Sequence, residues 1–183
     1  MVRVNVAQLL KSPIGTVRVY DVSDNVDIGG SDYLVEGEVT LMRTNRSVLV
    51  EGELYTDIEL SCSRCLSPFG CPITINIEEE YFPTTDILTG SLLPLPGEPG
   101  SFTIDELNIL DLSEAIRQYA LLTIPMKPLC RQDCAGLCPV CGSNLNHMSC
   151  NCPSESIDPR WAGLYKLVVS NNQPLGNEEK GTK

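Results

Sequence analysis

The stretch GLCPVCGSNLNHMSCNC, residues 136–152, contains four cysteines, one histidine and no carboxylate. Cys138 and Cys141 flank Pro-Val and are followed by glycine, while Cys150 and Cys152 follow a short asparagine-rich loop. A Cys-Pro-x-Cys-Gly turn presents backbone N–H groups to its thiolates, and the glycine permits the tight turn after the second sulfur. Tetrahedral zinc takes four ligands, usually as two such pairs. The stretch therefore predicts a zinc site formed by Cys138, Cys141, Cys150 and Cys152.

Four of the other five cysteines form two further pairs. Cys62 and Cys65 bracket Ser-Arg at the tip between two predicted strands, and Cys130 and Cys134 precede the first cluster. Eight clustered cysteines predict two four-cysteine zinc sites and leave Cys71 as a free thiol. In the compact pairing, Cys62 and Cys65 share a zinc ion with Cys130 and Cys134. In a crossed pairing, which the spacing leaves open, they join the Cys-Pro-Val-Cys pair instead.

Paired cysteines also serve redox and hydrolytic enzymes. A thioredoxin-type Cys-x-x-Cys follows a strand and opens a helix, but Leu-Ser-Pro-Phe-Gly after Cys65 does not begin one. A zinc deaminase needs a His-x-Glu motif, whereas His147, the one histidine, lies in the Asn-rich loop and is a weaker ligand candidate than Cys150 or Cys152. The sequence favours a protein that is not an enzyme. The alternative is a thiol-based redox enzyme or sensor using Cys62 and Cys65.

The chain ahead of the clusters alternates apolar and polar side chains, which is typical of half-buried strands. The alternation predicts strands at 16–22, 33–44, 47–60 and 73–82, with a hairpin turn at 43–46. Gly52 interrupts the apolar face and predicts a bulge or a bend. Consecutive strands of this kind predict a mainly antiparallel β-sheet or small barrel.

Helical spacing of apolar residues predicts one helix from about 111 to 122, with Asp111 as its N-cap and Glu114 completing a capping box. Asp158-Pro159 predicts the start of a closing helix. The fold class is therefore α+β, a sheet or barrel with two short helices and a cysteine-rich zinc-binding C-terminal segment. The expected divisions are a β-rich domain at 1–125 with a mobile loop at 84–101, a zinc segment with the closing helix at 126–170, and a disordered tail at 171–183.

The charge of the chain is −11 and unevenly distributed. Residues 51–110 contain eleven Asp or Glu and a single arginine, Arg64. Such a field repels nucleic acid, so extensive direct RNA binding is not expected and any RNA contact must be local. A basic protein partner fits this segment better. The sequence has no apolar run long enough to span a membrane and no signal peptide, so we expect a cytoplasmic protein.

Several ordered motifs extend through the second half of the chain: Cys62-Ser-Arg-Cys65-Leu66 with Phe69, Leu129-Cys130-Arg-Gln-Asp-Cys134, Gly136-Leu-Cys138-Pro-Val-Cys141-Gly142, Asn144-Leu-Asn146, Cys150-Asn-Cys152 and Asp158-Pro-Arg-Trp161 with Leu164. Together they resemble the bacterial and plastid YceD family, whose members are called large ribosomal RNA subunit accumulation proteins. The resemblance implies a non-catalytic factor for large-subunit ribosomal RNA accumulation and ribosome assembly, stabilised by structural zinc. It implies a ribosomal protein or a pre-ribosomal large-subunit particle as the partner.

Overall fold

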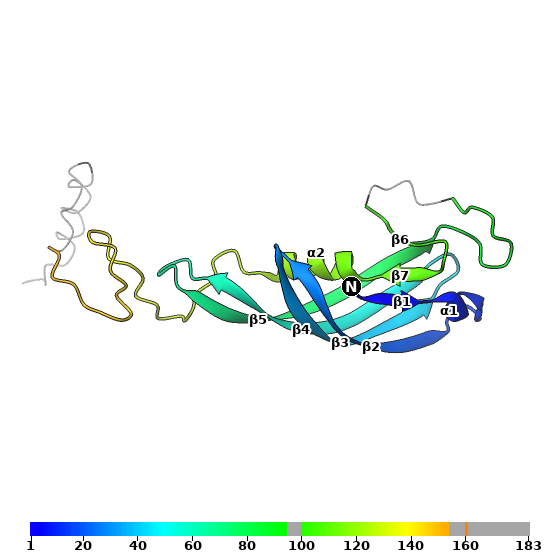
Figure 1. Cartoon of the computed structure of the whole chain (residues 1–183), viewed down its shortest axis with the longest axis horizontal. Helices are drawn as coiled ribbons and strands as arrows, with labels where there is room; N and C mark the ends of the chain where they lie inside the picture. The colour runs from blue at the N-terminus through cyan, green and yellow to red at the C-terminus, as the bar shows by residue number, and fades with distance from the viewer. Residues whose placement is uncertain (95–99, 154–159, 161–183) are drawn as a thin grey trace, which may run out of the picture. The chain divides into compact units, whose positions relative to one another are not determined.

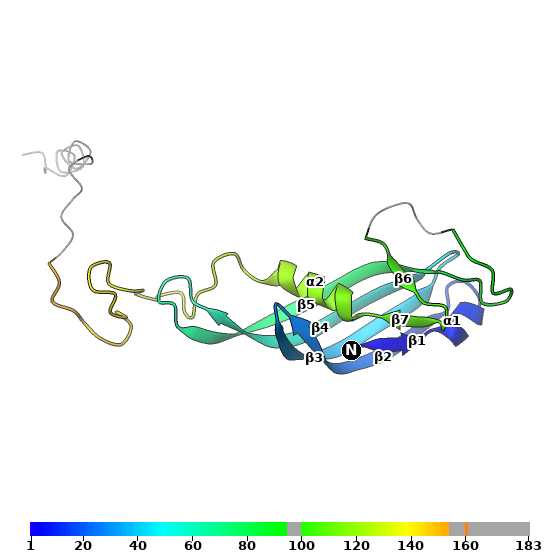
Figure 2. The same ribbon diagram turned by 45° about the horizontal axis from the view of Figure 1, so that its top comes forward.

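A computed structural model describes residues 1–94, 100–153 and 160 of the chain. Its internal contacts divide the chain into two compact units, 1–136 and 137–183. The first unit holds all the named helices and strands of the described residues (Figures 1 and 2): β1 (Arg3–Asn5), α1 (Ala7–Lys11), β2 (Val17–Ile28), β3 (Ser31–Arg43), β4 (Val48–Ser61), β5 (Pro68–Pro83), β6 (Phe102–Ile104), β7 (Ile109–Asp111) and α2 (Ser113–Thr123).

The seven strands form one sheet in the order β1-β7-β6-β5-β4-β3-β2. Strands β2 to β5 follow one another in antiparallel hairpins, and the three short strands extend the sheet beyond β5. One neighbouring pair, β5 with β6, is parallel, and there Tyr81 stacks on Phe102 with ring centroids 5.1 Å apart. The mainly antiparallel sheet predicted from the alternation is thus confirmed.

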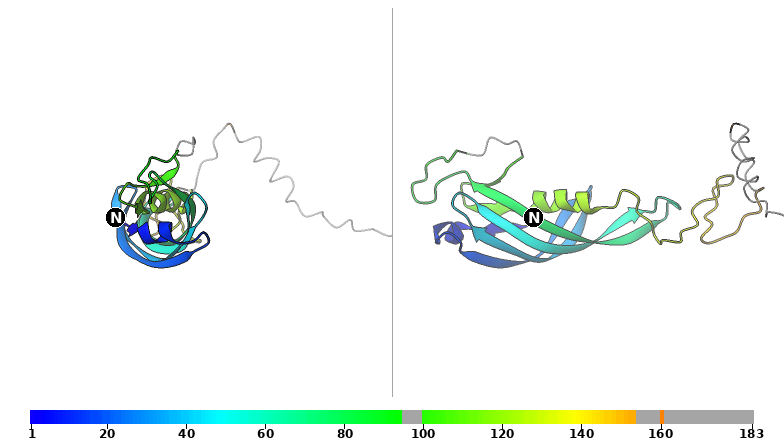
Figure 3. Two further views of the ribbon diagram at one scale, coloured as in Figure 1. Left: turned by 90° about the vertical axis from the view of Figure 1, so that its right-hand side faces the viewer. Right: turned by 180° about the vertical axis from the view of Figure 1, so that it is seen from behind.

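The sheet curves around helix α2, which Figure 3 shows from the end of the sheet. Helix α2 contacts both β5 and β2, although β3 and β4 separate these strands in the sheet. Its buried residues Ala115, Ile116 and Ala120 join the inward-facing strand residues in one hydrophobic core. The amino group of Met1, beside β1 at one edge, donates to Asp24 of β2 at the other edge at 2.9 Å. The architecture is therefore a half-barrel closed over a helix.

Two glycines let β3 and β4 approach closely inside this curve. A Cβ atom on Gly52 would lie 2.6 Å from Val39 Cγ1 and 2.7 Å from the Glu38 carbonyl oxygen. A Cβ on Gly37, whose φ is +151°, would lie 2.4 Å from the Glu53 carbonyl oxygen. The register runs through Gly52 without an extra residue, so there is no bulge at this position. The interruption of the apolar pattern marks a close backbone approach instead.

Several sequence-based expectations differ from the structure. Strands β1, β6 and β7 and helix α1 were not predicted, because elements of three to five residues are too short to show a period. The capping box is wrong: Asp111 ends β7 and accepts the backbone N–H of Ser113 at 2.9 Å, while Glu114 binds Arg117 and Gln118. The contact division at 136/137 falls later than the predicted boundary at 125/126.

Some expectations fall on residues that the structure leaves undescribed. The closing helix from Asp158 and the tail at 171–183 lie outside the described residues. Of the segment 84–101, residues 84–94 and 100–101 are described, and a turn at Asp86 is held by backbone N–H groups of Leu88 and Thr89. Among residues 1–94, 100–153 and 160, none of the helices has the length and hydropathy that crossing a membrane requires.

Candidate metal centres

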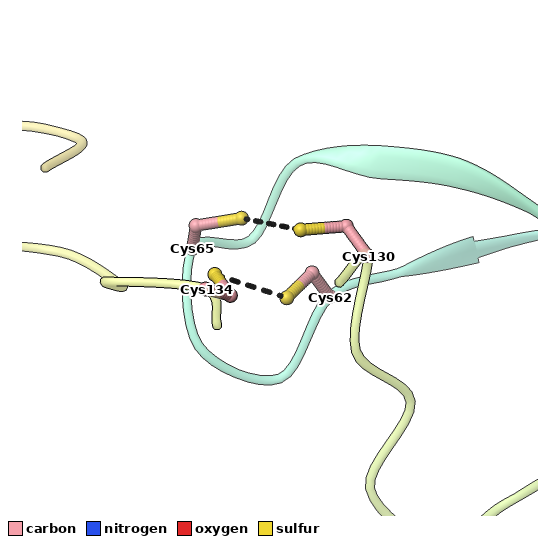
Figure 4. A group of neighbouring side chains, drawn as sticks. All are labelled: Cys62, Cys65, Cys130 and Cys134. Atoms are coloured by element: carbon pink, nitrogen blue, oxygen red, sulfur yellow. Dashed lines mark hydrogen bonds between the residues drawn. The ribbon is translucent and has the colours of Figure 1, made fainter. Parts of the chain in front are cut away.

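Four cysteines meet at the turn between β4 and β5 (Figure 4). Cys62 and Cys65 lie in the turn itself, and Cys130 and Cys134 come from the segment that follows α2. The sulfur atoms of Cys62 and Cys134 are 3.8 Å apart, and those of Cys65 and Cys130 are 3.7 Å apart. All four sulfurs lie within 4.8 Å of one another. We call this set, Cys62, Cys65, Cys130 and Cys134, the sheet quartet.

These separations fit a tetrahedral ion. Four sulfurs placed at a Zn–S distance of about 2.3 Å are about 3.8 Å from one another. A disulfide would require about 2.0 Å between two sulfurs, and all four cysteines are free thiols. Cys62, Cys65 and Cys134 are buried and Cys130 is exposed, so solvent reaches such a site from one side only. The sheet quartet could hold one metal ion.

Backbone contacts hold the distant half of the sheet quartet in place. The N–H of Ser63 donates to the Pro128 carbonyl at 2.8 Å. The Arg64 guanidinium donates to the carbonyls of Gln132 at 3.3 Å and Cys134 at 3.0 Å. Arg64 is thus a positioning residue that sequence reasoning missed. Its place between two candidate ligands was the available signal, because a cation there also offsets thiolate charge.

A second set lies within the unit 137–183. The sulfurs of Cys138, Cys141, Cys150 and Cys152 all lie within 4.8 Å of one another, and we call them the C-terminal quartet. Cys138 is buried, Cys141 is exposed and the other two are half-buried. The thiol of Cys141 lies 3.2 Å from the Ser143 hydroxyl. This quartet could also hold one metal ion, and its ligands are all local in sequence.

Both Cys-x-x-Cys turns have the same pattern of backbone hydrogen bonds. The N–H of Cys62 donates to Ser67 O at 2.9 Å, and that of Cys138 donates to Ser143 O at 2.8 Å. In each turn, the N–H of the residue after the second cysteine donates back to the carbonyl of the first, at 2.9 Å. Here the repeated pattern Cys-x-x-Cys-x-Ser was the signal in the sequence. Two copies of one turn, each presenting two cysteines of a candidate metal site, therefore occur in this chain.

The residue after each pair takes a left-handed conformation. Gly142 has a φ of +72°, as glycine does readily, but Leu66 has a φ of +58° at the equivalent position. A side chain there costs about 1 kcal/mol or more. The side chain of Leu66 is 65% exposed among the described residues. It therefore gains little from hydrophobic burial to compensate for this backbone conformation.

Within each quartet, one thiol has a pKa well below the usual value of a cysteine and another has a pKa well above it. Hydrogen bonds from the backbone N–H groups of Cys130 and Cys65 lower the pKa of Cys62 to about 6. Loss of solvation, followed by the neighbouring thiols, raises the pKa of Cys130 to about 12. The C-terminal quartet repeats this contrast: Ser143 lowers the pKa of Cys141 to about 6, and Cys141 raises the pKa of Cys152 to about 12. The thiols with raised pKa values therefore stay protonated near neutral pH, and a bound cation would favour their thiolate forms.

The structure thus brings together all eight cysteines in the groups of the compact pairing. Cys71 lies inward on β5, half-buried against the core. His147 is exposed and belongs to neither quartet. After Cys65 the chain enters β5 and not a helix, so the helix N-terminus of a thioredoxin-type site is missing here.

Comparison with known proteins gives one family and several relatives. The family model described as "Large ribosomal RNA subunit accumulation protein YceD" matches residues 50–168. An uncharacterized protein of Mycobacterium tuberculosis is 32% identical over 149 residues, covering 79% of this chain and 67% of the relative. A chloroplastic large ribosomal RNA subunit accumulation protein homolog of Arabidopsis thaliana is 27% identical over 163 residues, covering 78% and 51%. The maize homolog is 30% identical over 147 residues, covering 68% and 50%. No solved structure matches the chain.

Proposed function

Because this chain belongs to the YceD family, we propose that it acts in the cytoplasm as a non-catalytic factor for accumulation of large-subunit ribosomal RNA. We further propose that zinc in both quartets stabilises it and that its partner is a ribosomal protein or a pre-ribosomal large-subunit particle. The observation that carries the proposal is the family match over residues 50–168, which contains every cysteine of both quartets.

The geometry of the quartets supports a structural role for the metal. Each quartet supplies four sulfur ligands, which complete the coordination of a tetrahedral ion. A catalytic zinc ion keeps one position for water or substrate. The sheet quartet also joins the β4–β5 turn to the segment after α2, so its ion would stabilise a contact between residues far apart in sequence.

Depletion of this protein in cells is expected to lower the amount of large-subunit ribosomal RNA relative to small-subunit ribosomal RNA. The reason is that a large-subunit assembly factor acts on one of the two subunits. Quantification of both RNAs after depletion, with re-expression of the wild-type chain as the control, measures the effect. An unchanged ratio would overturn the proposed function.

Replacing Cys138 by serine is expected to release one of two zinc ions from the purified protein and to leave the sheet folded. The C-terminal quartet organises residues local to it, and metal-binding energy is folding energy for the part that the metal organises. Metal analysis and circular dichroism of the anaerobically purified variant would measure both effects.

The matched control is Cys71→Ser, which should retain both zinc ions and lose the one thiol that lies outside the two quartets. Unchanged zinc in the Cys138 variant would contradict the C-terminal site. A metal-free wild-type protein with reactive Cys62 and Cys65 would instead support the redox alternative.

A further inference from the structure

The solvent-facing side of strands β2 to β5 carries negative charge alone. We call it the outer face; it consists of the odd-numbered residues of β2 and β4 and the even-numbered residues of β3 and β5, whose side chains point away from the core. No lysine or arginine occupies any of these positions. The acidic residues there are all exposed: Asp21, Asp27, Asp32, Glu36, Glu38, Glu51, Glu53, Asp57, Glu59, Glu78 and Glu80.

The register places several of these carboxylates directly opposite one another. Glu38 lies between Asp21 on β2 and Glu53 on β4, and Glu51 faces Glu78 on β5. Like charges that face each other across strands destabilise a sheet. None of the ion pairs in the described part of the chain involves a residue of the outer face. Apart from Asp27, which the Arg117 guanidinium of α2 attracts, the carboxylates of the outer face therefore form no ion pair with a cation among the described residues.

The same face contains an apolar groove. Leu34 and Tyr55, each 51% exposed, line it together with Pro72, and the carboxyl groups of Glu36 and Asp57 lie among its walls. The groove is shallow and open to solvent, so an apolar side chain of a bound segment can reach Leu34 and Tyr55. A ligand for this surface would therefore combine positive charge with an apolar anchor. Electrostatic complementarity of this kind promotes association and suppresses binding of partners with the wrong charge.

We infer that the outer face is the docking surface for a lysine- and arginine-rich polypeptide segment that places an apolar side chain in the groove. The inference deepens the proposed function and rests on it for the ribosomal origin of the segment. Nucleic acid does not fit, because its phosphates would meet a face without a cation. A second copy of the outer face does not fit either, because it would bring the same charges together.

The test uses the full-length zinc-loaded protein and two synthetic peptides. Both peptides carry eight lysines and arginines separated by serines; one has a central Leu-Phe pair and the other has Ser-Ser. A triple variant, E38Q/E51Q/E53Q, removes three charges from the outer face. Its matched control, E106Q/E114Q/D133N, removes three exposed charges elsewhere. Fluorescence anisotropy at 0.1 M salt gives the affinities.

We expect the outer-face variant to bind both peptides more weakly, on the order of tenfold, since three exposed charge pairs are lost. The control variant should bind close to wild type. Leu34→Ser should weaken binding of the Leu-Phe peptide and leave that of the Ser-Ser peptide unchanged. Equal losses in the two triple variants, or tight binding of a 16-nucleotide single-stranded RNA, would overturn the inference. The ratio of large- to small-subunit ribosomal RNA after depletion tests the proposed function separately. Failure of the docking inference can therefore be told apart from failure of the proposed function.

Discussion

Cys65→Ser and Cys134→Ser are each expected to release the same single zinc ion, that of the sheet quartet. The sulfurs of these residues belong to one group with Cys62 and Cys130, so loss of either leaves three ligands for a tetrahedral ion. The binding free energy of a structural zinc ion is about 10–16 kcal/mol. Its loss should therefore free residues 128–136 from the β4–β5 turn. Metal analysis and hydrogen exchange of that segment measure the two effects.

The double variant Cys65→Ser/Cys134→Ser decides whether the two residues act as one unit. It should lose no more zinc than either single variant, because residues that share one ion are not additive. The control Cys71→Ser lies on β5 outside both quartets. If the single variants removed different ions, the crossed pairing would be correct and the compact pairing wrong.

Gly52→Ala is expected to destabilise the sheet by about 3 kcal/mol, because overpacking at a backbone approach leaves little room to relax. Its Cβ would meet Val39 Cγ1 at 2.6 Å and a carbonyl oxygen of β3 at 2.7 Å. For a domain of this size the loss corresponds to a melting temperature lower by roughly 10 °C. Thermal unfolding of the zinc-loaded protein, followed by circular dichroism, measures it.

The matched control is Gly70→Ala on neighbouring β5. There the new Cβ would lie 3.1 Å from a carboxylate oxygen of Asp57, a side chain that is exposed and can rotate away. We expect a change of less than about 1 kcal/mol in this variant. Equal destabilisation by the two substitutions would show that β3 and β4 do not approach as closely at Gly52 as the structure indicates.

The strands β3, β4 and β5 were predictable because apolar residues recur in them with a period of two, whereas β2 continues to Ile28, six residues beyond the predicted range 16–22, and its Val17 and Val19 are exposed. In β4 the even-numbered residues from Val48 to Ile58 are apolar, apart from Gly52 and Thr56, and they face the core. The short strands were not predictable, since their pairing depends on tertiary contacts such as Tyr81 on Phe102. The curvature of the sheet was not predictable either. Gly52 indicated an irregularity in β4, but whether it is a bulge or a close backbone approach depends on Val39 in the neighbouring strand.

The two groups of cysteines could be anticipated from their spacing, because a Cys-x-x-Cys pair supplies two adjacent ligands. The spacing could not decide which pairs meet, since the position of Cys130 depends on how the segment after α2 returns to the sheet. The role of Arg64 was visible only in part, as a cation between two candidate ligands. Its contacts are with backbone carbonyls of residues 132 and 134. Every residue has a backbone carbonyl, so the residue types do not indicate which of them accepts a hydrogen bond.

The separation of the sheet quartet along the chain has a consequence for synthesis. Cys65 and Cys130 are 65 residues apart, whereas the C-terminal quartet lies within one short stretch. At about 5–20 residues per second, translation needs roughly 3 to 13 s between these two cysteines. During this interval Cys62 and Cys65 supply only two of the four sulfurs of the candidate site. The nascent chain therefore exposes a reactive thiol pair that the finished protein encloses.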